Sequence, residues 1–94
     1  MKIKINKKGN INRLMRYLGY HPDKYQDPEE PSFSRPLRGD KFPRFHIYYQ
    51  PKKDQLNLHL DQKPPRYSSA IDHGAEYDGK LVRKEAERIK KELQ

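Results

Sequence analysis

Residues 43–61, PRFHIYYQPKKDQLNLHLD, constrain the fold most, because they have the pattern of a β-hairpin with two chemically different faces. Successive side chains of a strand point to opposite sides, so each arm divides its residues between two faces. One face carries apolar residues, namely Phe45, Ile47, Tyr49, Leu56, Leu58 and Leu60. The other carries polar residues, namely Arg44, His46, Tyr48, Asn57, His59 and Asp61. The sequence therefore predicts a hairpin with a core on one side and crowded polar groups on the other.

The turn decides which polar residues meet. If the turn consists of the four residues 51–54, Gln50 pairs with Gln55 and His46 lies directly opposite His59. Side chains in such positions are about 5 Å apart at Cβ. A register shifted by two residues would place His46 opposite Asn57 or Asp61 and keep the character of both faces.

Composition indicates one small folded domain, residues 1–94, with a limited core. Leu, Ile, Val and Phe make up 18 of the 94 residues and the net charge is +8, a balance close to that of disordered chains. Seven tyrosines and three periodic apolar segments favour a folded state. The chain has no cysteine, and its N-terminus MKIKINKKGN lacks the apolar run of a secretory signal. We therefore expect a cytoplasmic protein with no membrane partner.

Three further segments have regular patterns. Apolar and polar side chains alternate in residues 2–6, which predicts a short strand. Residues 11–19 have an apolar stripe with helical spacing and predict a helix, with Asn10 as its N-cap and Gly19 as its C-terminal stop. Residues 79–93 predict a C-terminal helix whose mixed charges, Glu85 included, are typical of a solvated face.

Two long stretches lack such patterns. Residues 21–43 contain five of the eight prolines and predict a long irregular segment, as do residues 62–79. The expected order is β-α-β-β-α, an α+β fold. Its three-stranded antiparallel sheet would have both helices packed on the apolar face.

Three segments, SFSRPLRGDKFPRFHIYY, NLHLDQKPPRY and HGAEYDGKLVRKEAERIKKEL, resemble a family of small, uncharacterised proteins of candidate-phylum bacteria with reduced genomes. The resemblance covers residues 32–93 and implies a bacterial, cytoplasmic origin. It implies no activity and assigns no functional residue.

The distribution of charge favours a polyanionic partner. Before Asp23 every charged side chain of the chain is a lysine or arginine, and a second basic group leads into the hairpin. Tyrosine, histidine and cationic side chains on one sheet face are typical of single-strand-binding surfaces. We therefore expect a small RNA-binding domain. Its predicted contacts are Lys2, Lys4, Arg44, His46, Tyr48 and His59.

Three alternatives remain open at this stage. His46 and His59 could act as acid and base in a ribonuclease-like reaction. A metal ion could be held by some of His46, His59, Asp61 and His73, although this spacing matches no known metal motif and no cofactor is expected. A protein partner could instead dock on the Leu81/Val82 flank, with no role for nucleic acid. We assign no catalytic residue and favour a protein that is not an enzyme.

Overall fold

The predicted hairpin forms the middle of the sheet in the computed structural model, which describes residues 1–5, 9–39, 42–62, 75–76 and 79–93. Strand β4 spans Arg44–Gln50 and strand β5 spans Gln55–Asp61. A 3-10 turn, Pro51–Lys53, and Asp54 with a φ of 48° connect them. Gln50 pairs with Gln55 and His46 with His59, so the register expected for a four-residue turn is confirmed.

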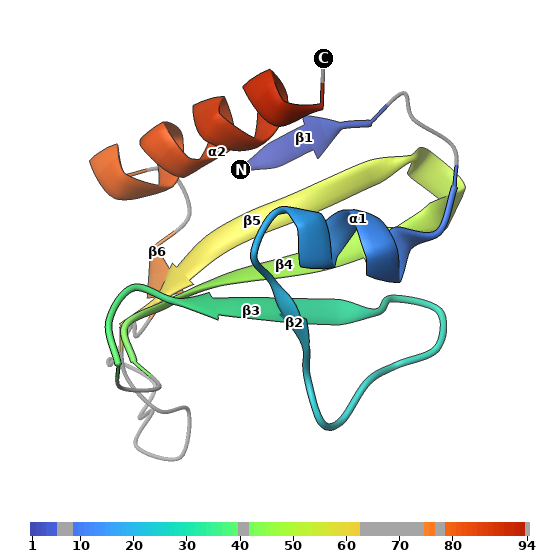
Figure 1. The fold of residues 1–94 in the computed structure, drawn as a ribbon, viewed down its shortest axis with the longest axis horizontal. Coiled ribbons are helices and arrows are strands. Elements are labelled where there is room, and N and C mark those ends of the chain that lie inside the picture. The colour runs from blue at the N-terminus through green and yellow to red at the C-terminus, as the bar shows by residue number, and fades with distance from the viewer. Residues whose placement is uncertain (6–8, 40–41, 63–74, 77–78, 94) are drawn as a thin grey trace.

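The expected sheet of three strands is wrong, because the described part of the chain forms six antiparallel strands (Figure 1). Their order is β1-β5-β4-β3-β2, and β6 also pairs with β5. The additional strands and β1 have the bounds β1 Lys2–Lys4, β2 His21–Pro22, β3 Ser32–Pro36 and β6 Ala75–Glu76.

Strands β2 and β3 lie in the proline-rich segment that was expected to be irregular. Proline disrupts a strand where its missing N–H would join the ladder. Here Pro31 precedes β3, while Pro36 and Pro22 are the last residues of β3 and β2. Phe33 is fully buried, but it is the only large apolar side chain within β3. A single apolar residue gives no alternation, so the sequence pattern could not reveal this strand. Strand β6 likewise falls within the stretch 62–79 that was expected to be irregular.

The two helices begin and end close to their predicted positions. Helix α1 spans Ile11–Tyr17, and the side-chain oxygen of Asn10 accepts hydrogen bonds from the backbone N–H groups of Asn12 and Arg13. Gly19, with a φ of +93°, follows the helix end in the left-handed region that glycine adopts most readily. Helix α2 spans Lys80–Glu92. Neither described helix has the length and apolar character needed to cross a membrane.

Both helices contribute to one core on the apolar face of the sheet. Met15 and Leu18 of α1 and Ile89 of α2 pack in the same cluster as Ile47 and Leu58 of the hairpin. Tyr20 and Phe33 join this cluster from outside the elements that the sequence revealed. Neither of the two helices that the structure describes packs on the opposite, polar face of the sheet.

Helix α2 departs from the expected solvated face at Glu85, which is only 4% exposed. The Tyr20 hydroxyl donates a 2.5 Å hydrogen bond to Glu85 Oε2, and the Arg88 guanidinium donates two more, at 2.8 and 3.0 Å. Arg88 also donates to the carbonyl oxygen of Leu18. This buried carboxylate therefore connects α2 to the residues that follow α1.

Candidate functional site

The polar face contains a row of side chains centred on two imidazoles. His59 of β5 and His46 of β4 are directly opposite each other, and Ser34 of β3 continues the row. The ring centroids of the two histidines are 5.0 Å apart. His46 is 7% exposed and His59 is 6% exposed, so neither ring is an open surface group.

Asp61 connects the members of this row. It lies two residues after His59, on the same face of the strand, because side chains alternate. His46 Nδ1 lies 3.0 Å from Asp61 Oδ2, and His59 Nε2 lies 3.0 Å from Asp61 Oδ1. Arg44, which pairs with Asp61 across the ladder, donates from Nε to Oδ2 over 3.2 Å. One carboxylate thus accepts from three side chains.

A second carboxylate comes from Asp23, which directly follows β2. Its Oδ2 lies 2.7 Å from His46 Nε2, and its Oδ1 accepts a 2.6 Å hydrogen bond from the Ser34 hydroxyl. Its backbone N–H donates to the carbonyl oxygen of Ser32. Asp23 is not among the site residues predicted from the sequence, because its approach to His46 depends on the pairing of β2 with β3, which the sequence pattern did not reveal. We call Asp23, Arg44, His46, His59 and Asp61 the polar cluster.

The two carboxylates control the protonation of His46. Burial alone would lower the pKa of His46, but hydrogen bonds to Asp23 and Asp61 outweigh it and raise the pKa above its ordinary value. Burial would likewise raise the pKa of Asp23, yet hydrogen bonds from His46 and the neighbouring serines lower it to about 2. The pKa of Asp61 is also lowered, despite its burial, by hydrogen bonds from His46 and His59. Both ring nitrogens of His46 face carboxylate oxygens, an arrangement that favours the protonated ring.

Tyr48 closes one side of the polar cluster. Its ring stacks on His59, with centroids 5.5 Å apart and planes 18° apart, and lies 4.6 Å from the centroid of His46. A hollow of about 380 Å³ opens beside Tyr48 and His46. Asp27 and Glu30 are among the residues that line it, so this side of the polar face carries acidic groups.

The structure separates the predicted site residues into two groups. Arg44, His46, Tyr48, His59 and Asp61 come together as described above. Lys2 and Lys4 lie on the outer strand β1, opposite Asn57 and Gln55. Both lysines therefore lie nearer to the hairpin turn than the pair His46 and His59 does. The Lys4 ammonium donates a hydrogen bond to the Lys53 carbonyl oxygen at that turn. His73 lies outside the described residues.

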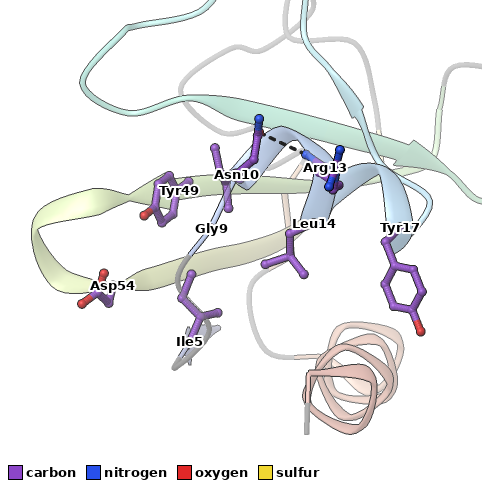
Figure 2. A pocket seen from close by; sticks show the side chains of 9 residues that line it. Ile5, Gly9, Asn10, Arg13, Leu14, Tyr17, Tyr49 and Asp54 are labelled. Atoms are coloured by element: carbon purple, nitrogen blue, oxygen red, sulfur yellow. Dashed lines mark hydrogen bonds between the residues drawn. The ribbon is translucent and has the colours of Figure 1, made fainter.

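A second hollow, of about 570 Å³, lies on the other face between α1 and the hairpin (Figure 2). Ile5, Leu14 and Tyr49 line it with apolar groups, while Arg13 and Asp54 lie at its edges. Nothing in the sequence pattern marked this hollow. At the flank considered for a protein partner, Leu81 is 47% exposed but Val82 is fully buried.

No protein-family model matches the chain, and no curated protein or solved structure is significantly similar to it. The resemblance noted in the sequence therefore stays a prediction. Any functional conclusion has to rest on the geometry and charge of the chain itself.

Proposed function

We propose that this protein binds a polyanion, with RNA as the favoured ligand, through exposed lysine and arginine side chains near strand β1. The observation that carries this proposal is the one-sided charge of the exposed surface. Asp23, Asp61 and Glu85 are engaged in buried or half-buried hydrogen-bonded clusters. Most of the cations, in contrast, are exposed. Among the described residues, thirteen lysine and arginine side chains are exposed against five acidic ones, and this excess favours contact with phosphate groups.

The exposed cations gather around one edge of the sheet. Lys2 and Lys4 lie on β1, the outer strand, and Lys52 and Lys53 lie at the adjacent hairpin turn. Helix α2 packs on β5, the strand next to β1 (Figure 1). Its exposed cations are Lys80, Arg83, Lys84, Lys90 and Lys91. We call these residues of β1, the turn and α2 the basic edge.

The opposite edge of the sheet has a different charge. Strand β2 forms that edge, and the connection from β2 to β3 carries the exposed acids Asp27 and Glu29 and the half-buried Glu30. This asymmetry supports an oriented encounter, in which a polyanion approaches the basic edge and is repelled from the other.

The contacts proposed here differ in part from those expected from the sequence. His46 and His59 are too deeply buried to stack on bases, and Arg44 is held by Asp61. Lys2 and Lys4 keep their proposed role. Contacts to phosphate carry no sequence information, so we expect affinity that depends on salt and little on base sequence. The ribonuclease-like alternative is not proposed, because carboxylates occupy both ring nitrogens of the buried His46.

The test is fluorescence anisotropy with a labelled single-stranded RNA of mixed sequence over a series of salt concentrations. The logarithm of the association constant should fall linearly with the logarithm of the salt concentration. The double variant Lys52→Gln/Lys53→Gln should bind on the order of tenfold more weakly and lower the salt slope by about two.

The matched control is Lys24→Gln/Arg38→Gln, which removes the same charge from exposed positions away from the basic edge. We expect it to change affinity much less. Affinity that ignores salt would contradict polyanion binding. Equal losses in the two double variants would contradict the basic edge as its location.

A further inference from the structure

We propose that the polar cluster is a zinc site, in which His46 Nδ1, His59 Nε2 and the Asp61 carboxylate bind one Zn²⁺ ion. The inference is independent of the proposed RNA binding, because none of these three side chains belongs to the basic edge.

The donor atoms are already close to the spacing that coordination requires. All three ligand groups have donor atoms within 4.8 Å of one another. Asp61 oxygens lie 3.0 Å from His46 Nδ1 and 3.0 Å from His59 Nε2. Two ligands bound tetrahedrally to Zn²⁺ at about 2.0–2.1 Å are about 3.3 Å apart. Binding to one ion would bring all three donor atoms from within 4.8 Å to about 3.3 Å of one another, which requires small shifts of the imidazole rings as well as of the carboxylate.

The backbone holds these donors in place. His46 and His59 are directly paired in the centre of the sheet, and Asp61 follows on the same strand and face. Two imidazoles and one carboxylate form a ligand set that suits Zn²⁺. Three protein ligands leave a fourth position for water or another ligand, as in zinc sites that exchange their fourth ligand.

Two neighbouring side chains support the ligands in the way that known metal sites do. Ligating histidines usually donate their second ring N–H to a carboxylate, which fixes the tautomer and the orientation of the ring. Asp23 accepts from His46 Nε2 at 2.7 Å, which directs Nδ1 towards Asp61 and His59. Arg44 donates to Asp61 Oδ2 and orients the ligating carboxylate.

The local charge also favours a cation. With both imidazoles neutral, as ligands must be, the polar cluster contains two carboxylates and one guanidinium, and its net charge is negative. Zn²⁺ would bind the lone pair of His46 Nδ1 and offset this negative charge.

The test begins with protein freed of metal by a chelator and desalted. Calorimetric titration with Zn²⁺ should give one ion per chain, and Zn²⁺ should raise the unfolding temperature. Co²⁺ in its place should give the visible absorption bands of a tetrahedral site. In NMR spectra of the wild type, Zn²⁺ should shift the ring signals of His46 and His59 and leave those of the exposed His21 unchanged.

Variants locate the site. His59→Gln should lower the affinity for Zn²⁺ at least a hundredfold, whereas His21→Gln, which removes an exposed histidine of β2, should leave it unchanged. Asp23→Asn keeps all three ligands and should weaken binding about ten- to hundredfold. Circular dichroism establishes that each variant is folded.

The proposal is overturned if the wild type binds no Zn²⁺ at micromolar concentrations. It is also overturned if the ring signals of His46 and His59 do not respond, an outcome that needs no variant. Equal zinc affinities of His59→Gln and His21→Gln would place any binding elsewhere. RNA affinity, measured separately, is expected to be the same in His59→Gln and the wild type.

Discussion

Asp61 is the residue on which most of the polar cluster depends, because it accepts from Arg44, His46 and His59 at once. A buried charge that loses its only partner costs much more than the pair contributes when intact. Several groups would lose a partner together if this one carboxylate were neutralised.

We therefore predict that Asp61→Asn lowers the free energy of unfolding of the metal-free protein by about 2 kcal/mol. This value is below the range for fully buried pairs, because the Asp61 side chain is 16% exposed. Urea denaturation measures the loss. Asp27→Asn, at an exposed position, is the control and should change the free energy by less than about 0.5 kcal/mol. A similar effect in both variants would contradict the central position of Asp61.

The same cluster predicts how stability depends on pH in the presence of a chelator. The pKa of His46 is raised above 6.5 in the folded state, so its contribution is complete below about pH 6.5 and is lost as the pH rises through the folded pKa. The pKa of Asp23 is lowered from 3.8 to about 2, so its contribution is present above about pH 4 and is lost as the pH falls towards 2. Stability should be greatest between these limits.

Urea denaturation from pH 3 to pH 9 tests this expectation. His46→Gln should remove most of the decline on the alkaline side, because glutamine does not titrate. A wild-type profile that is flat between about pH 6 and pH 8 would show that the carboxylates do not retain the His46 proton.

At the scale of elements, the connections that follow α1 carry more of the structure than their sequence suggests. Tyr20 is buried, and its hydroxyl donates to the buried Glu85 of α2, whereas Tyr17 is 67% exposed and donates to Glu92 of the same helix. The chain therefore provides two tyrosine–glutamate hydrogen bonds that differ mainly in burial.

We expect Tyr20→Phe to lower the free energy of unfolding by about 1–2 kcal/mol, because Glu85 then loses a buried donor. Tyr17→Phe should cost much less than Tyr20→Phe, since water replaces the hydroxyl at an exposed site. Thermal unfolding of both variants gives the comparison. Equal losses of unfolding free energy in the two variants would show that the burial of Glu85 does not strengthen its hydrogen bond with Tyr20.

The end of α1 gives another matched pair. Gly19 has a φ of +93°, and a Cβ added there would lie 3.3 Å from Cδ of Arg35. Gly19→Ala should therefore destabilise the protein by at least about 1 kcal/mol, through backbone strain and the close contact. Gly39 has no atom within 4 Å of such a Cβ, so Gly39→Ala should be close to neutral. Chemical denaturation measures the unfolding free energy of both variants. An unchanged value for Gly19→Ala would contradict the predicted backbone strain at residue 19.

The elements that could be predicted are those whose own residues carry a repeated pattern. Alternation and a four-residue turn were enough for β4, β5 and the pairing of His46 with His59. Apolar spacing was enough for both helices, and Asn10 and Gly19 also marked the two ends of α1. Strand β3 offers one apolar residue, and Asp23 reaches His46 only because β2 pairs with β3. Glu85 looked solvated because its partner Tyr20 is distant in sequence. These contacts depend on tertiary structure, which local pattern does not contain.

On the scale of the whole molecule, one sheet separates two interiors of different character. The apolar face is covered by α1 and α2, and the polar face is filled by the hydrogen-bonded polar cluster. All large fully buried apolar side chains belong to the single apolar core of the described chain. A domain of this size has only about 5–15 kcal/mol of net stability, so it can lose few of these contacts.

Leu58→Ala tests that dependence, because Leu58 of β5 is fully buried in this core. We expect a loss of about 2–5 kcal/mol, enough to unfold a large share of the molecules at moderate temperature. Leu81→Ala, at a position that is 47% exposed, should cost less than about 1 kcal/mol. Denaturant midpoints would show the contrast, and comparable losses would argue against a single core.

Both ends of the sheet are very short strands. Strand β1 has three residues with Lys2 and Lys4 on its outward face, and β2 has two and ends in Pro22. Short, charged or proline-containing edges resist pairing with the strands of other molecules. The neighbour of β1 in the sheet is β5, which carries Leu56, Leu58 and Leu60. These two strands are joined by only three residue pairs. Fraying of those three pairs would expose the backbone edge of β5 as a template for aggregation, so the colloidal stability of this protein depends on a strand of only three residues.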